Sequence, residues 1–112
     1  MRILVVCGAG ASSTFVALRL RKRAALSDVE FAATAAGLGE LPALLHGPEP
    51  VGAVVVGSHL EKHLDSIRRD AVGIPVVLLP PEGIADQTGD VAYRAVEKAL
   101  VAAGTPTGRH GS

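Results

Sequence analysis

The apolar residues of this chain form short runs that are separated by longer segments with a helical repeat. The first run, Ile3-Leu4-Val5-Val6, predicts a strand over residues 2–6. A continuous run without strict alternation is typical of a central strand that is covered on both faces. Three further strands are expected, at 29–34, where apolar residues alternate, and at 52–56 and 74–79.

Between the strands, the apolar spacing is that of amphipathic helices. Val16, Leu20 and Ala24 recur every four residues and mark the buried face of a helix over roughly 13–25. Similar stripes predict helices over roughly 59–70 and 91–103, and a short helix is expected between residues 37 and 48. Residues 80–89 are expected to form a loop. The residues expected to cap helices are Ser12, Ser13 or Thr14 for the first, Ser58 for the third and Asp90 for the last.

The order of these elements predicts the fold. Strands that alternate with helices favour a parallel sheet with helices on both faces, and right-handed crossovers give the strand order 2-1-3-4 of a flavodoxin-like α/β fold. The order reverses between the first and third strands. Ligands of such sheets bind at this point, beyond the carboxyl ends of the strands. The segments 7–14 and 57–59 are expected to meet there.

The composition of the chain argues against several classes of function. The 112 residues are 48% hydrophobic and 20% charged, with 11 basic and 11 acidic residues, so one domain over 1–103 and a disordered tail over 104–112 are expected. A zero net charge and 3% aromatic residues argue against a nucleic-acid partner. No apolar run is long enough to span a bilayer, and one cysteine fits a cytoplasmic, reducing location. No metal is expected, because the histidines lack ligand spacing.

Cys7 is the candidate reactive residue. It stands where the first strand ends and just before a segment of small and hydroxyl residues that leads into a helix. Free backbone N–H groups and the helix dipole make such a turn a cradle for an anion. The same surroundings lower the pKa of a thiol and favour the nucleophilic thiolate. The residues expected to bind a phosphate-sized anion here are Gly8, Ala9, Gly10, Ala11, Ser12, Ser13 and Thr14.

Three known phosphate-binding motifs resemble this segment in part, and each differs from it at a defined position. The dinucleotide fingerprint fails because its third glycine is Ser13 and because no acidic residue ends the second strand. A Walker loop fails because it requires a lysine. The motif of low-molecular-weight cysteine phosphatases needs an arginine six positions after the cysteine, and Ser13 stands there. Such a phosphatase also needs a general acid, for which Asp86 is the candidate.

The chain resembles the IIB component of a bacterial phosphotransferase system, of the lactose/cellobiose/chitobiose branch. The resemblance rests on residues 3–13, on Val54-Val55-Val56-Gly57 before a helix, and on Ile74-Pro75-Val76. It implies the α/β fold of low-molecular-weight cysteine phosphatases and a cytoplasmic phosphotransferase. Cys7 is then the phosphocysteine, which accepts a phosphoryl group from a histidine of a IIA protein and passes it to a sugar that enters through the membrane protein IIC. The resemblance also implies transient contact with the inner face of the membrane, no cofactor, and a monomer.

Two other functions stay open from the sequence. One is a low-molecular-weight phosphatase or arsenate reductase, and the other is a regulatory module without transport partners. His59, at the expected reversal of the strand order, is an accessory candidate that could contact the phosphate or tune Cys7. The basic cluster Arg19, Arg21, Lys22 and Arg23 is either a docking patch for an acidic partner or a solvated helix end.

Overall fold

Four parallel strands form one sheet at the centre of the molecule. The structure is a computed structural model that describes residues 2–6, 10–48 and 50–102, with the backbone alone for 10–13. The strands pair in the order β2-β1-β3-β4, which confirms the predicted α/β fold class and strand order. Their bounds are Arg2–Val6 for β1, Ala32–Ala36 for β2, Ala53–Gly57 for β3 and Val76–Leu79 for β4.

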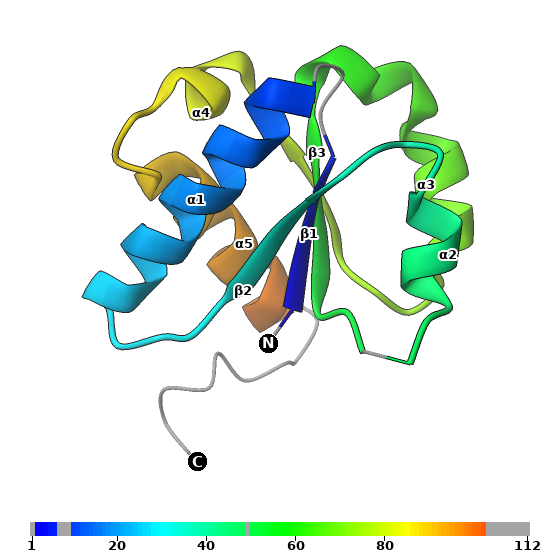
Figure 1. The fold of residues 1–112 in the computed structure, drawn as a ribbon, viewed down its shortest axis with the longest axis horizontal. Helices are drawn as coiled ribbons and strands as arrows, with labels where there is room; N and C mark the ends of the chain where they lie inside the picture. Colours follow the sequence, from blue (N-terminus) through cyan, green and yellow to red (C-terminus); the bar gives the residue numbers. More distant parts are fainter. Residues whose placement is uncertain (1, 7–9, 49, 103–112) are drawn as a thin grey trace.

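Helices cover both faces of the sheet, as predicted (Figure 1). One face carries α1 (Gly10–Leu26), α4 (Pro81–Ala85) and α5 (Asp90–Ala102). The other carries α2 (Leu41–Leu45), the 3₁₀ helix η1 (Ser58–His63) and α3 (Leu64–Asp70). The sheet therefore separates two apolar cores, each closed by its own helices.

The apolar run of β1 supplies both cores. Ile3 and Val5 belong to the core under α1 and α5, whereas Leu4 and Val6 belong to the opposite core, and all four side chains are fully buried. Each such side chain contributes about 1.5–3 kcal/mol by leaving water. The run lacks alternation because each of its faces meets helices.

The second strand begins three residues later than predicted, at Ala32 in place of Val29. Arg2 is the first residue of β1 and pairs with Ala32, so within the described part of the chain β1 offers no partner to the segment 29–31. Val29 and Phe31 are nevertheless buried in the core under α1. Their alternation correctly marked the buried side, while the partner strand determined where pairing begins.

The predicted helix at 59–70 is divided in two. Its first part is η1, in which Leu60 leaves the helical region with φ −106° and ψ 18°, and α3 follows from Leu64. Ser58 is not an N-cap, because Gly57 occupies that position and no side chain caps the helix. The fourth strand also begins later than predicted, at Val76, since Pro75 lacks the N–H group that strand pairing requires.

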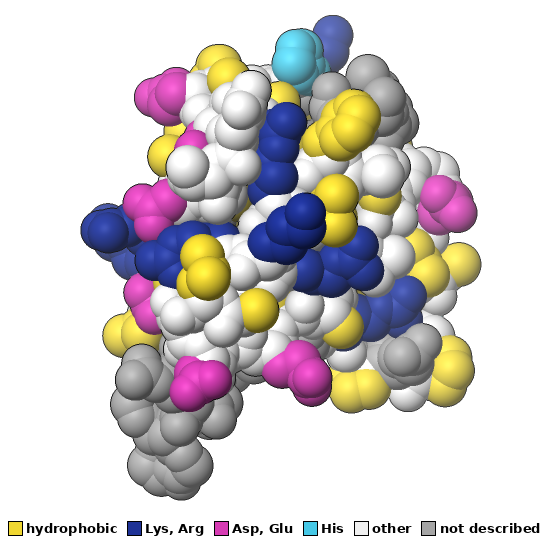
Figure 2. All heavy atoms as spheres, turned by 60° about the vertical axis from the view of Figure 1, so that its left-hand side comes forward, with side chains coloured by type: hydrophobic (Ala, Val, Ile, Leu, Met, Phe, Trp, Pro, Cys, Tyr) yellow, Lys and Arg dark blue, Asp and Glu magenta, His cyan; other side chains and the backbone are white. Residues whose placement is uncertain are grey.

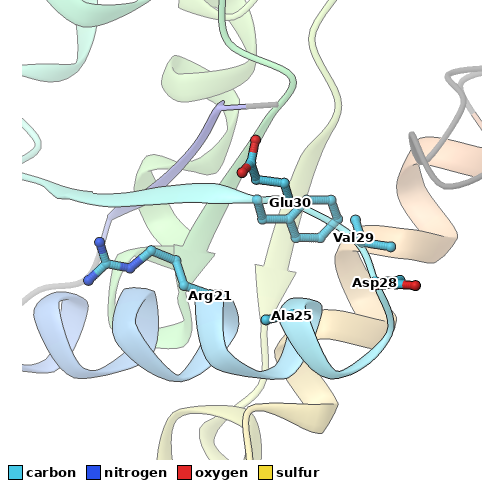
Figure 3. Close-up of a pocket in the computed structure, with 6 residues that line it drawn as sticks. Arg21, Ala25, Asp28, Val29 and Glu30 are labelled. Carbon is cyan, nitrogen blue, oxygen red and sulfur yellow. The ribbon is translucent and has the colours of Figure 1, made fainter.

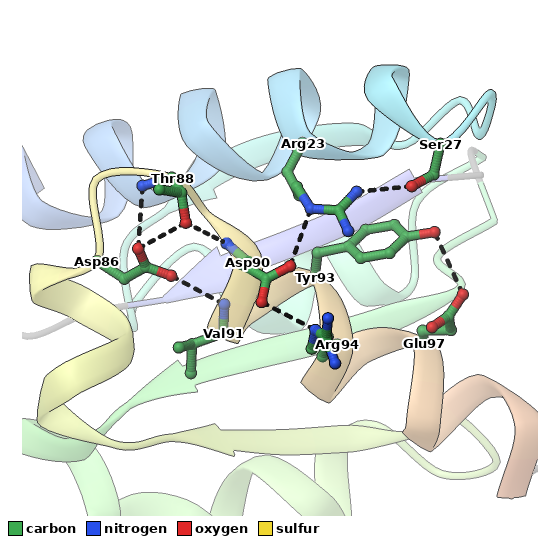
Figure 4. Close-up of polar contacts among 9 residues, drawn as sticks. All are labelled: Arg23, Ser27, Asp86, Thr88, Asp90, Val91, Tyr93, Arg94 and Glu97. Carbon is green, nitrogen blue, oxygen red and sulfur yellow. Dashed lines mark hydrogen bonds and ion pairs between the residues drawn. The ribbon is translucent and has the colours of Figure 1, made fainter.

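The predicted loop at 80–89 contains the helix α4, which has a proline in its first turn, where the missing N–H costs nothing. Asp90 does not cap α5 as expected. The hydroxyl of Thr88 accepts the N–H of Asp90 at 3.1 Å, and the carboxylate of Asp86 accepts the N–H of Val91 at 2.9 Å (Figure 4). The Asp90 carboxylate pairs with Arg23 at 3.0 Å and with Arg94 at 2.8 Å.

Candidate functional site

The sheet places the ends of β1 and β3 next to each other. From β1 the chain moves to β2 on one side and then crosses to β3 on the other, so the strand order reverses between β1 and β3. Val6 pairs with Val56, which makes the segments that leave the two strands neighbours at the carboxyl edge of the sheet. The starts of α1 and η1 lie at this same edge (Figure 1). The predicted location of the site is therefore the reversal point of the observed sheet.

Three residues connect β1 to α1. They are Cys7, Gly8 and Ala9, which lie outside the described residues, so the proposed thiol chemistry stays a prediction. The helix that follows begins at Gly10. The first four N–H groups of an α-helix have no partner within the helix, and its dipole favours negative charge at that end. The segment that carries the cysteine thus leads directly into an end suited to an anion.

The helix start changes the role predicted for the hydroxyl residues. Because α1 begins at Gly10, the residues Ser12 to Thr14 lie inside the helix, and the prediction that one of them is its N-cap is wrong. Gly10, Ala11, Ser12 and Ser13 form the first turn, where they offer backbone N–H groups; their side chains lie outside the described part. Thr14, in the second turn, has an exposed side chain.

His59 lies at the predicted edge of the sheet. It is the second residue of η1, directly after Gly57 and Ser58, and its side chain is exposed. Its proximity to the carboxyl end of β3 keeps it a candidate for contact with a ligand held between β1 and β3. Its accessory role stays a prediction.

The basic cluster of α1 is not one continuous docking patch. Arg19 donates a hydrogen bond to the backbone oxygen of Ile84 at 3.0 Å. Arg23 pairs with Asp90, donates to the hydroxyl of Ser27 at 2.6 Å, and lies 4.5 Å from the centre of the Tyr93 ring (Figure 4). Both arginines therefore fasten α1 to α4 and α5. No local pattern in the sequence indicates these contacts, because the partners lie 65 and 67 residues further along the chain.

The other two cations of the cluster, Arg21 and Lys22, have exposed side chains. Lys22 lies on the side of α1 opposite Leu20 and Ala24, which face the core. Arg21 lies at the flank of the helix, where it borders a pocket with the segment before β2. Arg21 and Lys22 can still contribute to a docking surface, whereas Arg19 and Arg23 are occupied by α4 and α5.

Asp86 stabilises the turn before α5 and the start of that helix. Its carboxylate accepts hydrogen bonds from the N–H of Val91 and from the N–H and hydroxyl of Thr88, the last at 2.7 Å. The Val91 N–H bond is the main cause that holds the pKa of Asp86 below its usual value, and the Thr88 bonds add to it. A general acid must carry a proton at neutral pH. Asp86 is ionised there, so it does not suit the acid of a phosphatase.

An open pocket of about 310 Å³ lies at the opposite end of the sheet (Figure 3). It is bordered by α1 and by the segment that leads into β2, through the residues Arg21, Ala25, Asp28, Val29, Glu30 and Phe31. The side chains of Arg21 and Glu30 point in different directions and do not converge on one point (Figure 3). This pocket is distant from the reversal point, because Ala32 pairs with the first residue of β1.

The described residues contain neither a metal-binding cluster nor a membrane-spanning helix. Within 2–6, 10–48 and 50–102, no group of three or more His, Cys, Asp and Glu side chains is arranged to hold a metal ion. No helix in that same part of the chain has the length and apolar character needed to cross a bilayer.

Comparisons with known proteins were made at the levels of sequence and structure. The sequence matches no protein-family model and no curated protein. The structure matches the lactose-specific IIB component domain of the phosphoenolpyruvate:carbohydrate phosphotransferase system from Streptococcus pneumoniae, with a TM-score of 0.71. The chain has a IIB fold. The match covers 90% of this chain and 95% of the IIB domain at 16% sequence identity, so the IIB likeness is one of fold across nearly the whole length.

Proposed function

We propose that this protein is a cytoplasmic phosphocarrier of a sugar phosphotransferase system. Cys7 accepts a phosphoryl group from a histidine of a IIA protein and passes it to a sugar that a IIC membrane protein translocates. The observation that carries this proposal is the position of the sole cysteine, directly after β1 at the reversal point of a IIB fold. Docking to IIC would bring the protein transiently to the inner face of the membrane.

The two transfers are nucleophilic displacements at phosphorus. In the first, the thiolate sulfur of Cys7 attacks the phosphorus of the phosphohistidine, an S–P bond forms, and the N–P bond breaks with the electron pair returning to the imidazole. In the second, a sugar hydroxyl attacks, the S–P bond breaks, and the hydroxyl proton passes to solvent or a base. The start of α1 offers N–H groups to the phosphoryl oxygens through both steps.

A carrier must keep its thiophosphate until the acceptor arrives. Ser13 stands where a phosphatase carries the arginine that stabilises the charge of the transition state. The carboxylate of Asp86 is ionised and accepts a hydrogen bond from the Val91 N–H at the start of α5. Both features disfavour rapid attack by water, and they support the carrier over the phosphatase alternative.

The decisive test is phosphorylation of the purified protein. Phosphoenolpyruvate, the general components of a phosphotransferase system and a series of candidate IIA proteins are supplied, and intact mass reports the gain of one phosphoryl group. We expect wild type to be labelled and Cys7→Ser to be unlabelled, since serine is a poor nucleophile at neutral pH. Circular dichroism should show equal thermal midpoints for the two proteins.

Two results would contradict the proposal. Label on Cys7→Ser would place the phosphoryl group on another residue. Steady hydrolysis of an aryl phosphate by wild type, without any labelling from IIA proteins, would favour the phosphatase.

A further inference from the structure

The helix α1 is apolar on two opposite sides. Val16, Leu20 and Ala24 face the core, and a second row at helical spacing faces away from it. This outer stripe consists of Phe15, Leu18, Lys22 and Leu26. Its apolar members are exposed to 55%, 39% and 83% in chain order. A helix that only closes a core needs one apolar side, so the second side requires its own explanation.

The outer stripe carries positive charge and no negative charge. No Asp or Glu occurs between residues 10 and 26. Arg23 pairs with Asp90, and Arg19, which donates to Ile84, has its guanidinium carbon 5.8 Å from the centre of the Phe15 ring. Lys22 is the exposed cation within the stripe, and the exposed Arg21 lies at its flank. Figure 2 shows the same arrangement over the whole face, with Lys and Arg across its middle, hydrophobic side chains among them, and most Asp and Glu near its border.

This combination fits an acidic protein surface better than a second copy of the chain. In a pair of α1 helices, Lys22 and Arg21 of one copy would meet the same cations of the other, with no carboxylate on either helix. An anionic bilayer carries the same sign of charge as an acidic protein, and vesicle binding distinguishes the two. A protein that presents an apolar side chain among carboxylates would satisfy both the stripe and its cations.

The outer stripe also adjoins the candidate site. Phe15 lies five residues after Gly10, which is about 7.5 Å along the helix axis at 1.5 Å per residue. Gly10 itself is three positions after Cys7. A partner that covers Phe15 and Leu18 therefore stands beside the carboxyl edge where β1 ends. A protein bound to the stripe thus lies next to the helix start that follows Cys7 in the sequence.

We infer that the outer stripe is the docking surface for the acidic protein that donates the phosphoryl group. This inference rests on the proposed function. Leu18 and Phe15 supply the apolar contact, and Lys22 with Arg21 selects a partner with carboxylates. Docking through the stripe changes how tightly the donor binds and leaves the chemistry at the cysteine unaltered.

The test uses the full chain and the IIA protein that labels wild type. Initial rates of phosphoryl transfer are measured against IIA concentration for Leu18→Glu, Lys22→Glu and two controls. Val72→Glu replaces another exposed apolar residue, 82% exposed and after α3, and Lys98→Glu reverses an exposed cation of α5. We expect KM to rise about tenfold or more in both stripe variants, as for loss of a strong interface residue, with unchanged kcat. The controls should match wild type.

A milder variant, Leu18→Ser, keeps the test valid if Leu18→Glu does not fold, as judged by circular dichroism. Wild-type KM in the folded stripe variants would overturn the docking surface and leave the phosphocarrier function standing. Absence of labelling of wild type by any IIA protein would overturn the function and this partner together. Cosedimentation of wild type with phosphatidylglycerol vesicles that Lys22→Glu abolishes, with unaltered KM, would assign the stripe to the membrane.

Discussion

Gly89 determines how closely α1 can approach the turn before α5. Its φ is +75°, in the left-handed region, and a Cβ there would lie 2.5 Å from the backbone oxygen and 2.8 Å from the carbonyl carbon of Arg19. Both atoms belong to the backbone of α1 and cannot move as a side-chain end can. Gly89→Ala therefore has two costs, one from the backbone conformation and one from the contact.

Gly73 separates these two costs. Its φ is +79°, almost the same, but a Cβ at that position would meet nothing within 4 Å. Gly73→Ala should therefore lose only the left-handed preference, about 1–2 kcal/mol. Gly89→Ala should lose that amount plus an overpacking cost of about 1–3 kcal/mol. The difference between the two variants measures the contact between α1 and the turn.

The assay is urea unfolding followed by far-ultraviolet circular dichroism. With a slope of about 1–3 kcal/mol per molar, the contact cost corresponds to a clearly lower midpoint for Gly89→Ala than for Gly73→Ala. The hydrogen bond from the Tyr93 N–H to the Gly89 oxygen, 2.9 Å long, survives the substitution and does not confuse the comparison. Equal losses of unfolding free energy in the two variants would show that α1 can shift away from the turn without cost.

Two further predictions concern pH and the core. The hydrogen bonds that lower the pKa of Asp86 stabilise the fold above the usual aspartate value of about 3.9, and this stability is lost as pH falls through the lower folded-state pKa. Asp86→Asn should flatten the acid side of the pH–stability curve, and an unaltered curve would contradict this. Leu20→Ala should cost about 2–5 kcal/mol, whereas Leu26→Ala, 83% exposed, should cost little; similar losses in urea unfolding would contradict the assigned faces of α1.

The architecture could be predicted because the apolar pattern of β1 alone indicates a central strand. Ile3 to Val6 are apolar without alternation, a pattern that is typical of a strand between two helical layers. The start of β2 could not be predicted, because it depends on where Arg2 begins the neighbouring strand and not on residues 29–31. Strand boundaries of this kind are set by the partner and are absent from the local sequence.

The helix α4 was missed because its sequence, Pro-Glu-Gly-Ile-Ala, contains two residues that usually interrupt helices. Gly83 is there for packing, since a Cβ would lie 2.5 Å from the side chain of Leu79. At the candidate site, the predicted strand order gave the reversal point between β1 and β3 correctly, while the role of Cys7 stays a prediction. The anchoring of α1 through Arg19 and Arg23 could not be predicted, because it depends on distant partners. Contacts between residues that lie 65 or more positions apart produce no periodic pattern in the sequence.

The parallel pairing of β1 has a consequence for biosynthesis. Ile3 of β1 pairs with Ala53 of β3, so the central strand leaves the ribosome 50 residues before one of its two neighbours. At about 5–20 residues per second, its apolar side chains wait some seconds for the strand and helices that cover them. During that interval the nascent chain exposes apolar surface that makes it prone to aggregation. Synonymous codon changes that slow translation between β1 and β3 should therefore lower the soluble yield of this protein without altering the finished molecule.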